Sequence, residues 1–449
     1  MRIAIIGGGI SGLTLAHFLY REYPKRLRAK PSRGSQSEPA HVTTDQQSGT
    51  VYLKVFEAEK YLGGHTRSIQ VDDPSGPLNI DMGFIVFNQR TYPNFCEILK
   101  QLNVDSQPTK MSFSVHCEKT DLLYRGLDID GLFAQRKNLL NPRFGKMLLD
   151  WLRFNKLAQR LLLEGWNELT VDEFFARHKF GSYFRDYYFY PMGSAVWSSP
   201  KSSFGKFPIF PILQFYRNHG LIGLDLPQWR VITGGSSRYV DKLRRSIEPF
   251  LSTDTRVHQV IPFNNHVRVV LESGMYEEFE HVVFATHSDQ ALELLGVNAP
   301  PLVKSVLSKF PYEPNVVTLH KDTRLLPKNR RAWACWNYFL PRSESAKATL
   351  TYNMNKLQNL RSETTYLVTL NRESEIDTNS ILNSVVFSHP QFTADRVKAQ
   401  SEHQHLIGLN GLSFCGAYWG NGFHEDGVKS ALPVLDYLNE KLKHVQLRL

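Results

Sequence analysis

The feature that most constrains the fold is a glycine-rich turn between an apolar run and a helical pattern at the start of the chain. Residues 2–6 are mostly apolar, as expected of a buried parallel strand. Gly7, Gly9 and Gly12 match the pattern GxGxxG, and residues 10–20 have helical spacing. The first glycine allows a tight turn, the second lets a pyrophosphate approach the backbone, and the third lets helix and strand pack closely. The sequence therefore predicts a Rossmann-type βαβ unit with a pyrophosphate at the helix N-terminus.

The second strand of such a unit ends in an acidic residue that hydrogen-bonds the adenosine ribose. Glu57 fits this position, with Glu59 as the alternative. Glu57 lies further along the chain than the roughly 20 residues usual for this spacing. Residues 21–50 account for the excess, because their basic start and their run of Ser, Gln, Thr and Gly predict a disordered surface insertion. A carboxylate at Glu57 favours a ribose hydroxyl over the negatively charged 2′-phosphate of NADP, so the sequence argues against NADP at this site.

Length and charge narrow the classes of function. A chain of 449 residues is longer than a single hydrophobic core usually supports, so two domains are expected. The formal net charge of +10 suits a phosphate-bearing ligand, and a basic contact with a membrane surface through residues 21–50 is a further possibility. No nucleic-acid-binding motif accompanies this charge, which disfavours nucleic acid as a partner.

The cysteines and the hydropathy pattern bear on the compartment. Cys96, Cys117, Cys335 and Cys415 form no CxxC pair, so neither a zinc site nor a dithiol redox site is expected, and no metal is predicted. Four thiols in a chain of this length suit a reducing compartment, and we expect a cytoplasmic protein. Glycines interrupt the apolar N-terminal stretch and no run of 18 apolar residues exists, so neither a signal peptide nor a transmembrane helix is expected.

A second glycine pair indicates the identity of the dinucleotide. Gly63 and Gly64 follow the predicted ribose-binding strand and precede His65, Thr66 and Arg67. This segment resembles the Gly-Gly segment of the flavin-containing amine oxidase superfamily, in which backbone and a basic side chain contact the FAD pyrophosphate. The superfamily usually has arginine directly after the glycines, where this chain has His65. The resemblance implies FAD as the cofactor, with contacts from Gly64, His65 and Thr66.

Three further segments support this resemblance. Residues 80–83 resemble the strand and turn that return the chain toward the flavin, and residues 257–260 resemble the strand that meets the adenine. Residues 414–428 resemble the C-terminal FAD motif of the superfamily. In that motif a second helix directs its N-terminus at the pyrimidine oxygen of the flavin, which stabilises negative charge on the reduced ring. The resemblance implies that the remaining FAD-binding residues are Ile10, Ser11, Ala58, Val260, Gly416, Glu425, Asp426, Gly427 and Val428.

A closer resemblance covers nearly the whole chain outside residues 21–50. Residues 83–88, 90–95, 191–198, 333–338 and 416–420 are similar to bacterial and fungal proteins described as predicted NAD/FAD-binding, amine-oxidase-like flavoproteins. Similar domains occur at the N-terminus of some plant cyclopropane fatty acid synthases. The resemblance implies an α/β, amine-oxidase-like fold in which a Rossmann-type FAD-binding domain with a parallel sheet accompanies a mixed substrate domain. Both domains are expected to be discontinuous, with the FAD domain at residues 1–83, 226–298 and 406–449 and the substrate domain at residues 84–225 and 299–405.

The catalytic residues are less defined than the cofactor site. Amine oxidases use an aromatic pair beside the flavin, and Phe423 matches one of these positions, whereas Tyr418 and Trp419 are candidates for the other by proximity alone. His424, Glu425 and Asp426 form an ionisable run that is expected to flank the flavin and to tune it or shuttle protons. The alternative is that Glu425 or Asp426 only favours the N-terminus of a helix. His287 is expected near the cofactor, with a purely structural role as the alternative, and Cys415 is expected to be a packing residue rather than a covalent anchor of the flavin.

The sequence predicts an FAD-dependent oxidoreductase that transfers a hydride from a carbon of a small-molecule substrate to flavin N5. The cyclopropane-synthase resemblance points to lipid metabolism and to a lipid or fatty acyl substrate. The alternatives are a true amine oxidase, a non-catalytic FAD-binding partner of a lipid-modifying enzyme, and a module that binds a membrane surface through residues 21–50. The sequence does not specify the oligomeric state.

Overall fold

The computed structural model describes residues 1–29, 50–126, 128–165, 168–198, 201–223, 226–342 and 347–447. These residues form two compact units, each assembled from separate parts of the chain. Unit 1 comprises residues 1–66, 239–310 and 398–449, and unit 2 comprises residues 67–238 and 311–397. The predicted domain boundaries at 83, 225, 298 and 405 therefore differ from the observed ones by up to 17 residues, the largest difference being that residues 67–83 belong to unit 2.

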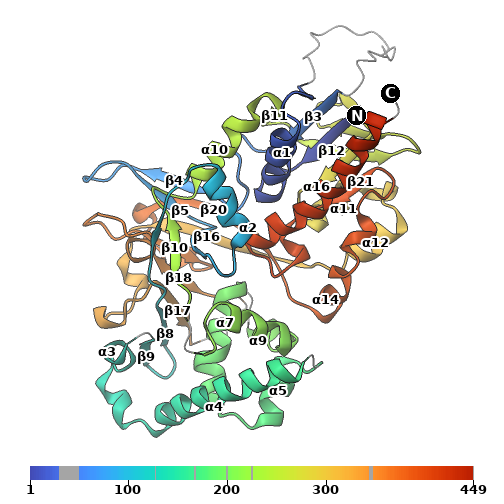
Figure 1. Ribbon diagram of the computed structural model, residues 1–449. Coiled ribbons are helices and arrows are strands. Elements are labelled where there is room, and N and C mark those ends of the chain that lie inside the picture. The colour runs from blue at the N-terminus through green and yellow to red at the C-terminus, as the bar shows by residue number, and fades with distance from the viewer. Residues whose placement is uncertain are drawn as a thin grey trace. The chain divides into compact units, whose positions relative to one another are not determined.

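Unit 1 is built on a parallel sheet (Figure 1). The strand order is β11-β3-β1-β15-β21, and the short β2 also pairs with β3. The strands are β1 (Arg2–Ile6), β2 (Leu27–Arg28), β3 (Val51–Phe56), β11 (Leu251–Ser252), β15 (His281–Phe284) and β21 (Leu412–Phe414). The chain continues from β1 to β3 on one side, whereas β15 and β21 lie on the other side. The carboxyl end of β1 is therefore the point where the strand order reverses, which is where open α/β sheets bind their ligands.

Two helices from opposite ends of the chain lie side by side in unit 1 (Figure 1). Helix α1 (Ile10–Glu22) follows the glycine turn and buries its apolar face. Helix α16 (His424–Leu447) follows β21, which is preceded by α15 (His403–Leu406). A second, antiparallel sheet contains β12 (Val257–Pro262), β13 (Val267–Leu271) and β14 (Tyr276–Phe279). The predicted α/β class with a Rossmann-type parallel sheet is thus confirmed.

The start of the predicted insertion is ordered. Arg21 and Glu22 complete α1, and Leu27 and Arg28 pair in parallel with Val51 and Tyr52. Regular structure thus extends past residue 21, where disorder was expected to begin, because this segment gains backbone hydrogen bonds from the adjacent strand despite its basic composition. Residues 30–49, the rest of the predicted insertion, lie outside the described residues.

Unit 2 contains a seven-stranded sheet and a group of helices. The strand order is β20-β16-β19-β18-β17-β8-β9. Its strands are β8 (Phe113–Cys117), β9 (Leu122–Gly126), β16 (Tyr312–His320), β17 (Trp336–Leu340), β18 (Leu350–Asn353), β19 (Leu367–Leu370) and β20 (Ile381–Pro390). Smaller sheets pair β4 (Ser68–Val71) with β5 (Leu78–Asp81), and β10 (Trp229–Ile232) with β6 (Phe87–Asn88) and β7 (Ser106–Pro108). The helices include α2 (Pro93–Gln101), α3 (Ile129–Leu132), α4 (Pro142–Glu164), α5 (Val171–His178), α7 (Tyr190–Trp197) and α9 (Ile209–Asn218).

One face of the large sheet is apolar and the other carries a row of small polar side chains. The row crosses six strands in register through Ser384, Thr318, Thr369, Thr351, Asn337 and Ser114. Thr369 and Thr351 hydrogen-bond through their hydroxyls at 2.9 Å, and the Ser114 hydroxyl donates to Asn337 Oδ1 at 2.9 Å. All members except Ser384 are buried, so these hydrogen bonds offset the cost of removing the polar groups from water.

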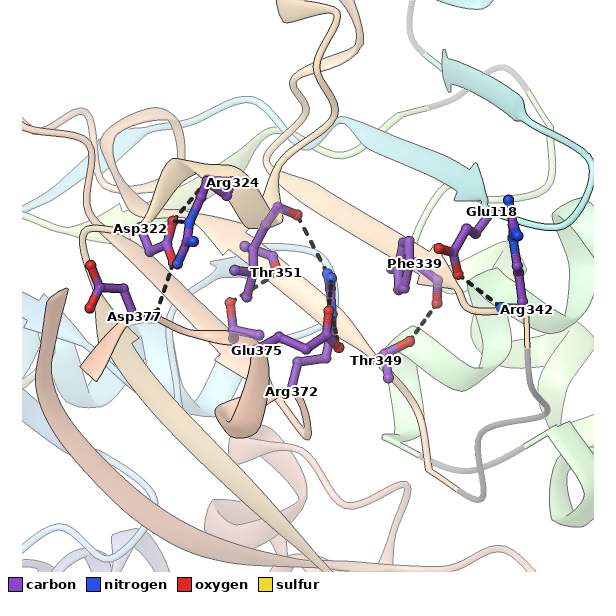
Figure 2. Close-up of polar contacts among 12 residues, drawn as sticks. Glu118, Asp322, Arg324, Phe339, Arg342, Thr349, Thr351, Arg372, Glu375 and Asp377 are labelled. Carbon is purple, nitrogen blue, oxygen red and sulfur yellow. Dashed lines mark hydrogen bonds and ion pairs between the residues drawn. The ribbon is translucent and has the colours of Figure 1, made fainter. Parts of the chain in front are cut away.

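Local ion pairs order the segments that follow β16 and β19, and a hydrogen bond from the Asp377 backbone links two of them (Figure 2). The Asp322 carboxylate accepts hydrogen bonds from Arg324 Nε and Nη2 at 2.9 and 2.6 Å, and from the Asp377 backbone nitrogen at 3.0 Å. Arg372, which is buried, donates to both carboxylate oxygens of Glu375, at 2.9 and 2.6 Å. Bidentate ion pairs of this kind fix the orientation of both side chains.

Two further predictions concern membrane helices and thiols. Within the described ranges, the structure contains no helix of the length and apolarity that a membrane span requires. All four cysteines lie in these ranges and carry free thiols. Cys415 is fully buried, and burial raises the pKa of its thiol to about 12, in keeping with the predicted packing role.

Candidate functional site

The glycine turn at the end of β1 is open on one side and tightly packed on the other. Gly7 has a φ of +112°, and a Cβ atom there would lie 2.6 Å from the Ala285 carbonyl oxygen. A Cβ atom at Gly12 would lie 2.0 Å from the Gly7 carbonyl oxygen, so α1 can approach β1 only without a side chain there. A Cβ atom at Gly9, in contrast, would meet no atom within 4 Å. The turn thus leaves room for a ligand at the second glycine, where the sequence predicts a pyrophosphate.

Glu57 and the second glycine pair line this turn. The Glu57 carboxylate accepts a hydrogen bond from the Gly8 backbone nitrogen at 2.7 Å through Oε2, and one from the Glu59 nitrogen at 2.9 Å through Oε1. The Gly63 nitrogen donates to the Gly8 carbonyl at 2.8 Å, and a Cβ atom at Gly64 would lie 3.4 Å from Gly9 Cα. The two glycine segments therefore lie side by side, with Gly64 exposed, Gly9 half-buried, and Gly8 and Gly63 buried. Glu57 lies beside them at the end of β3, as the sequence predicts.

The first turn of α16 packs directly against the first turn of α1. A Cβ atom at Gly427 would lie 2.8 Å from the Ile10 side chain and 3.0 Å from Ser11 Oγ, so the glycine permits the close contact. Asp426 closes the preceding turn, because its Oδ2 accepts hydrogen bonds from the Asn421 and Phe423 backbone nitrogens at 3.0 and 2.9 Å. The positive ends of two helix dipoles therefore meet at one place, which favours an anionic ligand or developing negative charge there.

His424, the first residue of α16, belongs to a buried hydrogen-bonded ring. Its Nε2 lies 2.9 Å from Thr66 Oγ1 and 2.7 Å from the Tyr239 hydroxyl, and these two oxygens are 2.5 Å apart. Burial, and to a smaller degree the charge of His65, lower the pKa of His424 to about 3, so the imidazole is neutral near pH 7. A neutral imidazole nitrogen has one proton or one lone pair, and it therefore shares this single bonding position between the two oxygens. The ring joins α16, α10 (Ser237–Ile247) and the loop after the second glycine pair.

A pair of histidines lies near this ring. The His65 ring stacks on the His287 ring, with centroids 5.4 Å apart and an interplanar angle of 26°. His287 caps the N-terminus of α11 (Ser288–Leu295) and follows Ala285, which contacts Gly7. The structure thus brings both residues beside the glycine turn, and His65 occupies the position predicted for the basic contact with a pyrophosphate.

The predicted adenine strand connects to the end of β3. The segment that enters β12 is bonded to it through two backbone hydrogen bonds, from Thr255 to the Glu57 carbonyl and from Asp254 to the Glu59 carbonyl. Val260 is fully buried in β12 and pairs with Val269 in β13. The structure therefore places β12 on the Glu57 side of the sheet, where the adenosine end of a dinucleotide would lie.

Tyr418 and Trp419 belong to a group of aromatic rings in unit 1. The Tyr418 and Trp419 rings lie 5.0 and 5.3 Å from Phe310. The Trp419 ring also stacks on His403 at 4.2 Å, and burial lowers the pKa of His403 to about 4. These contacts are typical of packing.

The remaining predicted residues lie near the two helix starts. Ser11, Glu425 and Val428 are buried, Ala58 follows Glu57, and the Gly416 nitrogen donates to Ser430 Oγ at 2.8 Å. The sequence analysis missed Tyr239 and Ser430. Ser430 is three residues after Gly427 in the last helix, and the helical spacing could have indicated it. Tyr239 lies in an ordinary amphipathic helix, and no local pattern marks it.

Replacing His424 with glutamine should weaken the dependence of stability on pH. In the folded protein His424 stays neutral down to about pH 3, whereas in the unfolded chain it takes up a proton below about pH 6.5. Unfolding therefore binds a proton in this window, and the free energy of unfolding falls as the pH falls. Urea unfolding of the FAD-free protein at several pH values should show a shallower fall for His424→Gln than for the wild type. If the free energy of unfolding fell equally with pH in both proteins, His424 would not be taking up a proton on unfolding.

Comparison with known proteins adds to this geometry. The family model described as flavin containing amine oxidoreductase matches residues 10–350, about three quarters of the chain. No curated protein sequence matches the chain.

Solved structures share the fold along almost the whole chain. Cyclohexylamine oxidase from Brevibacterium oxydans IH-35A has a TM-score of 0.67 at 14% identity, covering 98% of this chain and 99% of its own. A CLA-producing fatty acid isomerase from P. acnes has a TM-score of 0.65 at 13% identity, with 98% of each chain covered. Reduced UDP-galactopyranose mutase has a TM-score of 0.63 at 15% identity, covering 97% of this chain and 96% of its own. At these identities, the likeness shows a common fold.

Proposed function

The chain belongs to the family of flavin-containing amine oxidoreductases and is an FAD-dependent oxidoreductase, and we propose that it removes a hydride from a carbon atom of a lipid or fatty acyl substrate. The observation that carries the proposal is the convergence of the first turns of α1 and α16 at the glycine turn. One helix start suits the pyrophosphate, and the other suits the negative charge that a flavin gains on reduction. Membership in an oxidoreductase family sets aside the non-catalytic FAD-binding partner.

FAD fits the residues of unit 1. The space at Gly9 admits a pyrophosphate against the backbone of the glycine turn, and Glu57 keeps lone pairs for ribose hydroxyls beside its two backbone hydrogen bonds. The FAD contacts that we assign are those from Gly7, Gly9, Ile10, Ser11, Gly12, Glu57, Ala58, Gly64, His65, Thr66, Val260, Gly416, Glu425, Asp426, Gly427 and Val428.

FAD, when bound, supplies the acceptor for a hydride from a substrate carbon. The protein contributes position and electrostatics. The neutral ring of His424, Thr66 and Tyr239 holds the start of α16 in place without adding a charge. Asp426 is held by two backbone nitrogens of its own turn, so we assign it to the shape of the turn rather than to the binding of a cationic amine.

A lipid substrate is supported by the resemblance to the N-terminal domain of plant cyclopropane fatty acid synthases and by the fold shared with a fatty acid isomerase. A true amine oxidase is the second candidate, supported by the family model and by the fold shared with cyclohexylamine oxidase. Contact of residues 21–50 with an anionic membrane surface remains a prediction, because residues 30–49 lie outside the described residues.

The two substrate classes can be separated by anaerobic titration of the FAD-loaded protein. A fatty acid or phospholipid should bleach the oxidised flavin absorbance, and primary amines should leave it unchanged. Bleaching by amines alone would favour the second candidate. Failure of every member of both classes would contradict both substrate assignments, and release of FAD on heat denaturation would test the cofactor independently.

Replacing Phe423 with alanine should change the rate of flavin reduction more than the affinity for FAD. Phe423 directly precedes α16, and its half-buried side chain matches the family position beside the flavin ring. An aromatic side chain there narrows access to N5, so its removal should alter substrate alignment. Stopped-flow reduction and FAD titration of Phe423→Ala measure the two effects. Normal reduction together with a lowered melting temperature would assign Phe423 to packing instead.

A further inference from the structure

Helix α4 of unit 2 has an apolar stripe on its exposed side. Leu149, Leu152 and Leu163 are 67%, 59% and 85% exposed. With 3.6 residues per turn, these three leucines and Lys156 lie on one face, opposite the buried face that carries Phe144, Met147, Phe154 and Ala158. A helix on the surface of a globular protein normally presents polar residues on this side. Three leucines in one stripe therefore indicate a surface that another apolar phase covers.

The same end of unit 2 exposes further apolar side chains. Ile129 in α3 is 78% exposed, and Leu139 and Leu140, which directly precede α4, are 61% and 89% exposed. Among the described residues, six of the fourteen large apolar side chains that are exposed fall between residues 129 and 163. Exposed apolar side chains are therefore concentrated in the part of the chain that contains α4, rather than scattered evenly over the surface.

Basic side chains lie within the apolar stripe of α4 and along one edge of it. The helix carries five basic residues and two acidic ones, Asp150 and Glu164. The Asp150 side chain is only 6% exposed and lies 3.6 Å from Lys146 and 3.8 Å from Arg153, and Glu164 lies 3.2 Å from Arg160. No ion pair of Arg143 or Lys156 is found among the described residues. By the same helical spacing, Lys156 lies among the leucines, and Lys146, Arg153 and Arg160 lie along one edge of the stripe. The exposed face is therefore apolar with a basic residue inside it and a basic edge on one side.

We propose that this face of α4 binds the surface of an anionic lipid membrane. A helix that lies in the membrane interface buries leucines at the headgroup–acyl boundary and places Lys and Arg among the headgroups, where anionic lipids attract them. A second copy of the chain is a poorer occupant, because it would bring two sets of like charges together. The assignment does not rest on the proposed function, although an enzyme acting on lipids would meet its substrate at such a surface.

The test is sedimentation of the full-length, FAD-loaded protein with vesicles. The wild type should bind vesicles of phosphatidylcholine and phosphatidylserine in equal parts, should bind phosphatidylcholine alone more weakly, and should be released by high salt. The double substitution Leu149→Gln/Leu152→Gln should reduce binding by at least about tenfold, because the two leucines supply much of the apolar insertion. Lys156→Glu should weaken binding to the mixed vesicles more than to phosphatidylcholine.

Matched variants separate this face from general effects. Leu226→Gln/Met275→Gln removes two equally exposed apolar side chains elsewhere, and Lys242→Glu makes the same charge change on α10. These controls should bind like the wild type, and every variant should keep its FAD content and melting temperature. Equal losses in the controls, or no binding of the wild type to mixed vesicles, would overturn the proposal. So would a wild-type dimer that Leu149→Gln/Leu152→Gln converts to a monomer, which would assign the face to a second copy.

Discussion

Replacement of Gly12 with alanine is expected to yield a protein that purifies without FAD. A Cβ atom at this position would lie 2.0 Å from the Gly7 carbonyl oxygen, so α1 and the glycine turn would have to separate. Both elements form the proposed pyrophosphate site, and packed cores accommodate such overlaps poorly. The measurements are the ratio of flavin to protein absorbance after purification and the melting temperature.

Gly9→Ala is the matched control for Gly12→Ala. Its Cβ atom would meet no protein atom within 4 Å, so the FAD-free protein should melt like the wild type. The methyl group would nevertheless occupy the space that we assign to the pyrophosphate, and FAD should bind more weakly. If Gly12→Ala retained FAD as well as the wild type, the packing of α1 against the turn would be wrong. If Gly9→Ala did so, the assignment of this space to the pyrophosphate would be wrong.

Replacement of Glu57 with alanine is expected to weaken FAD binding on the order of tenfold or more, since hydrogen bonds to a charged group are worth roughly 1.5–3 kcal/mol each. The carboxylate also holds the Gly8 nitrogen at 2.7 Å, so part of the loss should come from a less ordered turn. Glu57→Gln keeps an acceptor for Gly8 without the charge and should bind FAD with intermediate affinity. Equilibrium titration of the FAD-free variants, followed by flavin fluorescence, gives the three affinities.

Glu59→Ala completes the series for the ribose site. Glu59 is exposed, and its side chain lies 3.7 Å from Arg256 instead of bonding to the glycine turn. This variant should bind FAD like the wild type. Weakened binding in Glu59→Ala together with normal binding in Glu57→Ala would reverse the assignment of the ribose-binding acid.

The local parts of unit 1 were predictable because their geometry is encoded in neighbouring residues. The GxGxxG spacing predicts a strand, a tight turn and a helix, and the structure has all three. Glu57 directly follows β3, where we propose that it binds the ribose. The hydrogen-bonded ring was only partly predictable. Thr66 and His424 belong to recognisable motifs, but Tyr239 joins them from a helix that is distant in sequence. Contacts of this kind depend on tertiary packing, which no local pattern specifies.

The domain boundaries illustrate the same limit. Residues 67–83 follow the FAD-type glycine pair without a break in composition, yet β4 and β5 pack into unit 2. Composition does not change there because both units use the same apolar residues in their cores. The ordered start of the predicted insertion has a related cause, since Leu27 and Arg28 gain their structure from pairing with β3 rather than from their own sequence.

The polar row of the large sheet has a consequence for how unit 2 folds. Its strands come from parts of the chain as distant as Ser114 and Thr369, so the sheet must assemble from non-local pairings, which form slowly. If any strand shifted its register by one residue, its hydroxyl or amide side chain would point toward the apolar face of the sheet. The polar side chain on the neighbouring strand would then lose its hydrogen-bond partner. Each misaligned intermediate would then bury unpaired polar groups, at a cost of roughly 1–3 kcal/mol per group. The row therefore makes every misaligned register less stable than the native one, so it selects a single pairing of the strands.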